Sequence, residues 1–226
     1  MRLRSQDGFT LVELLVAIVV GSIVTLAAFA LLDRSVVETR RTTDRVDSTQ
    51  RGRVAMDRIT RELRSQVCPV KVNPNDTSPA IVSGDGYSIT FWAFFGTRVF
   101  TPERYTIAWN AGTQSIDETV DDGAGTPVKR RASLIAGARL PSNVPLFAYY
   151  TYPSAGTAEP TQQLAVPPAA LSATELSQVS RIDVNFTAVP SGSSNPSMTE
   201  SAQFSDRVYV RGSDPNLPAG SQGPSC

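Results

Sequence analysis

The sequence predicts an α+β fold, in which one long N-terminal helix precedes a domain of antiparallel strands. Three observations support this fold class. An apolar run of 24 residues extends from Phe9 to Leu32. All 16 prolines of the chain lie after Cys68, so no proline interrupts a helix before that point. Beyond Pro69, short segments of alternating polar and apolar residues are separated by turn-forming residues.

The apolar run is long enough to cross a membrane. At a rise of about 1.5 Å per residue it makes a helix of roughly 36 Å, and the hydrocarbon core of a bilayer is about 30 Å thick. A removable secretory signal has an apolar region of only about 7–15 residues, which is shorter than this run. We therefore expect residues 9–32 to stay in the protein and to span the membrane once.

Glu13 is the one acidic residue in this run. An ionised acid costs about 2.5–3.5 kcal/mol at the centre of a span and less near its end, so Glu13 could simply reach the membrane interface. The polar leader MRLRSQDG offers another interpretation. Cleavage after Gly8 would create an α-amine on Phe9, which a helix places at i, i+4 from Glu13. A buried carboxylate needs a cationic partner, and this amine, or that of a neighbouring chain, would supply one.

The segment GFTLVELLVAIVV resembles the N-terminus of type IV prepilins and type II secretion pseudopilins. The resemblance implies that prepilin peptidase cuts between Gly8 and Phe9, and that the new Phe9 amine is N-methylated. Glu13 matches the acid at the fifth mature position of this family. That acid pairs with the N-terminus of an adjacent subunit during filament assembly. An ordinary membrane anchor is the alternative to this interpretation.

The helix is predicted to continue beyond the membrane and to end before Pro69, which disfavours helix at Cys68. Between Asp33 and Arg64, nine arginines are interleaved with six acidic residues. An apolar stripe at spacings of three and four indicates that the last turns pack against a domain. This stripe consists of Met56, Ile59, Leu63 and Val67.

The predicted organisation has four parts: a leader (1–8), a transmembrane half-helix (9–32), a soluble half-helix (33–67) and a β-rich globular head (68–226). Within the head, SGDG at 83–86 is predicted to form a turn. Residues 153–173 and the tail after Gly212 are predicted to be loops. The predicted strands are 87–94, 104–110, 144–152, 181–189 and 206–212.

Three later segments extend the resemblance: RVAMDRITRELRSQVC, ELSQVSRIDVNFTAV and FSDRVYVRG. They look like the helix end and two late strands of W-type minor pilins and J-type minor pseudopilins. Those proteins share the pilin fold, in which the long helix lies on an antiparallel sheet. The implied function is a minor subunit that initiates or caps a type IV pilus or a type II secretion pseudopilus. The alternative is a tip subunit whose head captures DNA, a surface or an exoprotein.

The resemblance implies a single-pass protein of the cytoplasmic membrane whose head is exported and then joins a filament at the cell envelope or surface. Arginines after the span outnumber those before it, which by the positive-inside rule favours a cytoplasmic head. Long domains, however, translocate largely regardless of charge. Pilin heads commonly tie down the C-terminal tail with a disulfide, which here would join Cys68 to Cys226. Such a bond needs an oxidising compartment, and two unpaired thiols are the alternative.

The sequence favours no enzyme. It has no histidine, so catalytic Ser-His-Asp and Cys-His systems and histidine-containing zinc sites are excluded. No cofactor motif is found. The acidic segment 117–122 is predicted to be a solvated turn, with a calcium loop as the less favoured alternative. The basic run 129–131 suggests DNA binding, but residues 69–226 carry ten basic against thirteen acidic side chains, so a solvated loop is favoured.

Overall fold

The chain divides into two units, Met1–Thr43 and Asp44–Cys226. Helix α1 (Leu11–Arg64) contributes its N-terminal part to the first unit and its C-terminal part to the second. The computed structural model describes residues 8–68, 79–94, 102–121, 130–164, 169–191, 201–218, 220–221 and 223.

In the first unit, α1 presents its side chains to the surroundings on all sides, and residues 8–43 are all exposed. Among the described residues, α1 is the one helix long and apolar enough to cross a membrane. Its polar interruptions are satisfied within the helix. The Ser22 hydroxyl donates to the carbonyl of Ile18 and the Thr25 hydroxyl to that of Gly21, each at 2.8 Å. Such internal bonding suits a helix in lipid, where no water replaces a missing partner.

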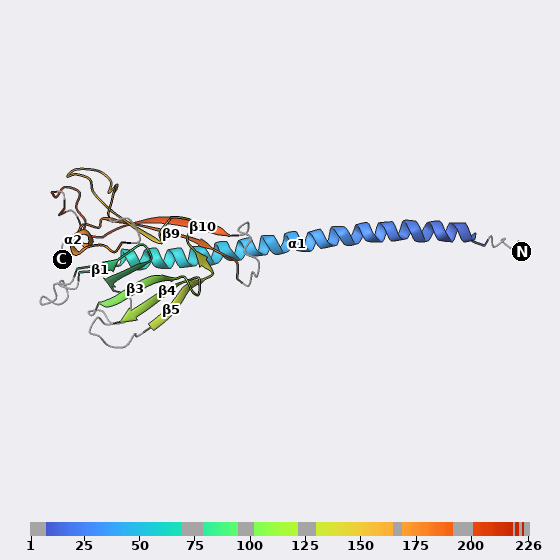
Figure 1. Cartoon of the computed structure of the whole chain (residues 1–226), viewed down its shortest axis with the longest axis horizontal. Coiled ribbons are helices and arrows are strands. Elements are labelled where there is room, and N and C mark those ends of the chain that lie inside the picture. The colour runs from blue at the N-terminus through green and yellow to red at the C-terminus, as the bar shows by residue number, and fades with distance from the viewer. Residues whose placement is uncertain are drawn as a thin grey trace, which may run out of the picture. The chain divides into compact units, whose positions relative to one another are not determined.

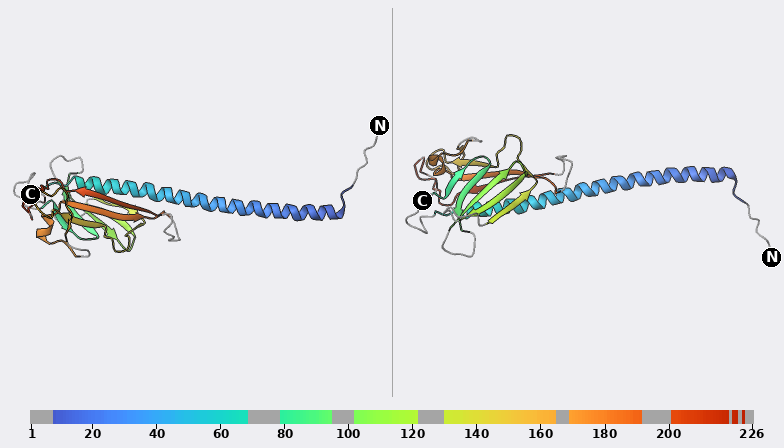
Figure 2. Two further views of the ribbon diagram at one scale, coloured as in Figure 1. Left: turned by 90° about the horizontal axis from the view of Figure 1, so that it is seen from above. Right: turned by 60° about the horizontal axis from the view of Figure 1, so that its bottom comes forward.

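The second unit contains two antiparallel sheets. In the first sheet, five strands lie in chain order, each paired with the next along the chain (Figure 2). The turn predicted at 83–86 joins its first two strands, and the Asp85 carboxylate accepts bonds from the backbone N–H groups of Tyr87 and Ser88. These strands are β1 (Ile81–Gly84), β2 (Ser88–Ala93), β3 (Glu103–Asn110), β4 (Ser115–Asp121) and β5 (Arg130–Ala136).

The second sheet has the order β10-β9-β7-β8, and a short strand β6 also pairs with β9. β9 and β10 pair along their whole length, from Arg181 opposite Tyr209 to Ala188 opposite Ala202. One short helix, α2 (Ala173–Leu176), precedes β9 and begins with a capping box between Ser172 and Glu175. The strands are β6 (Ala138–Arg139), β7 (Phe147–Thr151), β8 (Gln162–Gln163), β9 (Arg181–Ala188) and β10 (Ala202–Tyr209).

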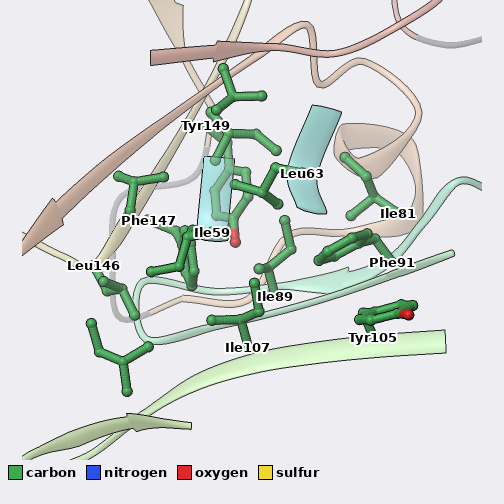
Figure 3. Close-up of a cluster of buried hydrophobic side chains, with 14 of the residues drawn as sticks. Ile59, Leu63, Ile81, Ile89, Phe91, Tyr105, Ile107, Leu146, Phe147 and Tyr149 are labelled. Carbon is green, nitrogen blue, oxygen red and sulfur yellow. The ribbon is translucent and has the colours of Figure 1, made fainter. Parts of the chain in front are cut away.

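The C-terminal part of α1 lies between the two sheets (Figure 1). Ile59 and Leu63, both fully buried, pack against side chains of both sheets. Figure 3 shows Phe147 and Tyr149 of β7 on one side of them, and Ile89 and Ile107 of β2 and β3 on the other. The buried stripe of α1 starts earlier than predicted, because small residues at its beginning let the second sheet approach closely. These residues are Ser48, Gly52 and Ala55.

α1 ends at Arg64 rather than at Val67. The chain leaves the helix because its backbone pairs with β2 instead: Gln66 forms a bridge with Ala93, and the Val67 N–H donates to the Trp92 carbonyl at 2.9 Å. The four expected strands at 87–94, 104–110, 144–152 and 181–189 are confirmed as β2, β3, β7 and β9. The last expected strand, 206–212, instead occupies Ala202–Tyr209.

Two predictions about charged segments were wrong. The acidic segment 117–122 is not a turn, since its residues up to Asp121 belong to β4, and residue 122 lies outside the described residues. The basic run 129–131 is not a loop, since β5 begins at Arg130, and Lys129 lies outside the described residues. In both cases a strand forms where the charged side chains had suggested a solvated turn or loop. The α+β class is confirmed, and the long apolar helix with antiparallel sheets is consistent with the pilin fold.

Candidate functional site

The helix start around Glu13 forms a capping box. The Glu13 carboxylate accepts hydrogen bonds from the Thr10 backbone N–H and from the Thr10 hydroxyl, each at 2.9 Å. In return, the Glu13 N–H donates to the Thr10 hydroxyl oxygen at 3.3 Å. These bonds satisfy N–H groups that a helix start leaves without partners. The T-x-x-E pattern at 10–13 is a capping-box signature and is visible in the sequence.

Gly8 and Phe9 precede this capped start. The i, i+4 argument expected Phe9 and Glu13 to share a helix face. α1 begins only at Leu11, so Phe9 precedes the helix and this expectation was wrong. Phe9 is 88% exposed, and a Cβ added to Gly8 would meet nothing within 4 Å. The fold therefore places no packing demand on a glycine at position 8. If a glycine is required at position 8, the requirement comes from another protein that binds this segment.

Comparison with known families decides what this terminus is. The family model for the prokaryotic N-terminal methylation motif matches residues 3–29. The chain carries a type IV prepilin signal. The matched range contains Gly8, Phe9 and Glu13 together with most of the apolar run. No curated protein and no solved structure matches the chain.

The prepilin signal supports a pilin or pseudopilin subunit. It implies processing by prepilin peptidase and assembly with other pilin subunits. Together with the apolar helix, the prepilin signal also suggests membrane anchoring. Subunits of this type are usually structural rather than enzymatic.

Away from the prepilin signal, a buried ionic cluster joins α1 to the first sheet. Arg58 donates through Nε to Glu62 Oε1 at 3.0 Å, and through Nη2 to Glu118 Oε2 on β4 at 2.6 Å. Burial, and then the neighbouring Glu118, raise the pKa of Glu62 to about 7. One guanidinium therefore faces two buried carboxyl groups, and a proton on Glu62 relieves their repulsion.

A second polar cluster attaches α1 to the end of β5 and to the residues that follow β9. Asp47 Oδ2 accepts from the backbone N–H and the hydroxyl of Ser191, at 3.0 and 2.9 Å. The backbone N–H bond is the main cause of a lowered pKa of Asp47. Arg51 donates to the carbonyl of Ala136, the last residue of β5, and to that of Val189, which follows β9, the latter at 3.3 Å. These contacts fix how the head sits on the helix segment that carries it.

The other predicted site residues, Cys68 and Cys226, belong to the second unit. Cys68 is buried just after α1, and Cys226 lies outside the described residues, so the Cys68–Cys226 disulfide stays a prediction. In the acidic strand β4, Asp121 pairs with Arg104 at 2.9 Å, and Glu118 pairs with Arg58. No group of three or more metal-ligating side chains occurs in the part of the chain that the structure describes.

Proposed function

We propose that the protein is a minor pilin or minor pseudopilin that initiates or caps a type IV pilus or a type II secretion pseudopilus. The prepilin signal at residues 3–29 is the observation that carries this proposal. According to this proposal, prepilin peptidase cleaves between Gly8 and Phe9, and the Phe9 amine is then methylated. Glu13 neutralises the terminal amine of an adjacent subunit. Gly8 and Phe9 are both exposed, which leaves the bond between them accessible to such an enzyme.

The minor-subunit assignment rests on three segments that resemble W-type minor pilins and J-type minor pseudopilins. They are far apart in the sequence, yet they lie together in the head. One forms the end of α1, and the other two contain β9 and β10, which pair along their whole length. Gly52 and Phe204 connect this helix end to β10 directly. The three segments that carry the resemblance thus form one packed unit of a helix and two paired strands, which is what a shared fold would produce.

Capping by Glu13 in the precursor is compatible with a later role in assembly. The capping bonds go to Thr10 within the same chain. Cleavage after Gly8 would add a cationic amine within two residues of this cap. A carboxylate in lipid gains more from a charged partner than from neutral donors, so an incoming subunit's amine would compete for Glu13.

The proposal is tested by the composition of native filaments. Filaments sheared from the producing cells are analysed by quantitative mass spectrometry, and the ratio of this chain to the most abundant pilin is measured. An initiating or capping subunit is present at a few copies per filament, and its deletion abolishes or strongly reduces filaments. A ratio near one would instead make this chain a major subunit, and unchanged filaments after deletion would contradict a role in initiation.

The alternative, a tip subunit whose head binds a ligand, is favoured by one observation. The head contains a hollow of about 670 Å³ between the end of β3 and the second sheet. DNA is not the favoured ligand, because none of the described residues that line the hollow is charged.

A further inference from the structure

The hollow lies on the face of the second sheet that points away from α1. Side chains alternate across a strand, so Phe147 and Tyr149 of β7 face the core, while Ala148 and Tyr150 face the hollow. Asn185 of β9 reaches it from the same face. A loop at 140–145 and the end of β3 complete the walls. Its volume of about 670 Å³ falls within the range of small-molecule sites, about 300–1,000 Å³.

Three aromatic rings line the hollow: Tyr87, Trp109 and Tyr150. The rings of Tyr87 and Trp109 lie 5.8 Å apart between centroids and are tilted by 35°. Tyr87 is 42% exposed although it is a large aromatic residue. On Tyr150, the guanidinium of Arg181 covers one ring face at 3.9 Å from the centroid. The walls thus offer apolar ring surface, with an electron-rich face that attracts weakly positive C–H groups.

Three side-chain amides complement the rings: Asn143, Gln163 and Asn185. An amide both donates and accepts hydrogen bonds. Asn185 Oδ1 accepts from the Ser205 hydroxyl at 2.8 Å, which orients its amide group and leaves the N–H donors for other partners. Asn143 and Gln163 are exposed at the rim. Nearby, Arg181 is paired with Asp183 at 2.8 Å, so its charge is compensated.

The walls are held in place before any ligand arrives. Asp85 fixes the turn that carries Tyr87, accepting its backbone N–H at 2.6 Å, and the Tyr87 carbonyl accepts the backbone N–H of Trp109 at 2.9 Å. In the opposite wall, Asn143 has a φ of +60°, a left-handed conformation that costs energy for a residue with a side chain. Pro141 and Pro145 flank it and stiffen the loop. A rigid site loses little conformational entropy on binding.

We propose that this hollow binds a neutral saccharide unit of a surface glycan. A sugar ring presents C–H groups on one face and hydroxyl groups around its edge. Aromatic rings match the C–H face, and amides match hydroxyls, which also donate and accept. Nucleic acids and acidic sugars would need cationic walls, and the lining residues within the described part of the chain include no Lys or Arg. An extended proline-rich peptide is the competing ligand, since such peptides also dock on aromatic walls.

This inference goes beyond the proposed assembly function and does not depend on it. The face opposite α1 would remain accessible in a subunit held by its helix. A head that fails to bind sugars could still belong to a minor pilin, and a sugar-binding head could belong to any pilin. Binding is therefore measured on the purified full chain, without filaments.

The experiment uses the full chain in a detergent that has no sugar headgroup. Maltose, lactose, cellobiose and N,N′-diacetylchitobiose are titrated to millimolar concentrations and followed by saturation-transfer NMR and tryptophan fluorescence. A proline-rich decapeptide and a single-stranded oligonucleotide are titrated in parallel. The chain has 2 tryptophans, so Trp92→Phe leaves Trp109 as the one reporter.

Each test variant has a matched control. Tyr87→Ala removes an exposed ring of the hollow, and Tyr209→Ala removes a ring of similar exposure, 47%, on β10. Asn143→Gly removes a rim amide at a positive φ that glycine adopts without strain. Gln114→Gly makes the same change at the other non-glycine residue with positive φ among the described residues, outside the hollow.

We expect at least one disaccharide to bind saturably. Its dissociation constant should rise roughly three- to tenfold in Tyr87→Ala and in Asn143→Gly, and stay within about twofold in both controls. The proposal would be overturned if none of the four sugars bound saturably, or if Tyr87→Ala and Asn143→Gly left sugar binding unchanged. It would also be overturned if the peptide or the oligonucleotide bound in place of the sugars and these variants weakened that binding.

Discussion

Gly52 of α1 lies directly against the ring of Phe204 on β10, and a Cβ built on Gly52 would overlap that ring. Phe204 in turn stacks on Phe186 of β9, with ring centroids 5.5 Å apart and planes inclined by 24°. Phe186 is fully buried in the core. The missing side chain at position 52 is thus what allows the second sheet to lie so close to the helix.

We predict that Gly52→Ala destabilises the head. In an exposed helix, the same change would stabilise by about 1 kcal/mol, because alanine has the higher helix propensity. Here the added methyl group must displace Phe204, and overpacking costs about 1–3 kcal/mol. Thermal unfolding followed by circular dichroism should show a lower Tm.

Gly21→Ala is the control, since a Cβ there meets nothing within 4 Å, and it should leave the Tm of the head unchanged. A Tm for Gly52→Ala at or above that of the wild type would contradict the close contact.

The buried cluster around Glu62 predicts a pH dependence. Its pKa is raised to about 7, mainly by burial and then by Glu118, whereas the unfolded chain has an ordinary carboxyl near 4.5. The folded state therefore holds a proton that the unfolded state has lost between these values. Because the folded state binds more protons there, this stabilisation is complete below about pH 4.5 and is lost as the pH rises through about 7.

Glu62→Gln tests this contribution, because the amide resembles the protonated acid and does not titrate. The difference in unfolding free energy between wild type and variant should change between pH 4.5 and 7, in the direction of a less stable wild type at higher pH. Glu38→Gln makes the same change at a carboxylate of α1 whose side chain is 69% exposed, and it is measured in parallel as the control for the substitution itself. A difference for Glu62→Gln that does not change with pH would show that Glu62 is not the titrating group.

The sequence predicted those parts of the fold whose signals are local. The apolar run, the proline-free stretch and the alternating segments at β2, β3, β7 and β9 each carry their pattern within one element. β4 was missed because its core-facing positions include Glu118, which looks like a solvated acid. Its charge is compensated by Arg58, 60 residues away in the chain, and that pairing exists only in the folded protein. No local pattern could have revealed it.

The candidate site divides in the same way. Gly8, Phe9 and Glu13 lie close together in the sequence, so the motif was visible without a structure. The capping box at Thr10 has an equally local pattern. The hollow lined by Tyr87 and Asn143 was invisible, because its walls come from both sheets and a loop. Single aromatic and amide residues in a β-rich domain have no distinctive spacing.

Processing is predicted at the Gly8–Phe9 bond. The intact mass of the native protein should correspond to a chain that begins at methylated Phe9. Gly8→Val should leave the leader attached, and the fold gives no reason for this loss, because a Cβ at position 8 is sterically free. Gly21→Val, a glycine in equally open space, should be cleaved normally. A native protein that still begins at Met1 in cells with active prepilin peptidase would refute the proposed processing.

The capping box allows the two roles of Glu13 to be separated. Glu13→Gln keeps a capping side chain but removes the charge, whereas Thr10→Val removes both hydrogen bonds of the capping hydroxyl and keeps the charge. If the charge pairs with a neighbour's amine, Glu13→Gln should be inserted and cleaved but absent from sheared filaments, as should Glu13→Leu. Thr10→Val should assemble at close to the wild-type level. Assembly of Glu13→Gln together with failure of Thr10→Val would show that helix capping, not charge neutralisation, is what assembly requires.

The last prediction is a disulfide between Cys68 and Cys226. The tail that ends in Cys226 is held against the head three residues earlier, where a Cβ on Gly223 would overlap the backbone of Ser177. Cys68 is buried where the chain leaves α1, at 7% exposure. A bond between these two residues would close nearly the whole head into one loop, and the chain-entropy model gives a stabilisation of at most about 5 kcal/mol for so long a loop. Typical domains have a total stability of about 5–15 kcal/mol, so reduction should lower the Tm strongly.

Cys226→Ser should reproduce the effect of reduction and should itself be insensitive to a reductant. Peptide mapping of exported protein under non-reducing conditions gives the direct measurement, and free thiols at both positions would exclude the bond.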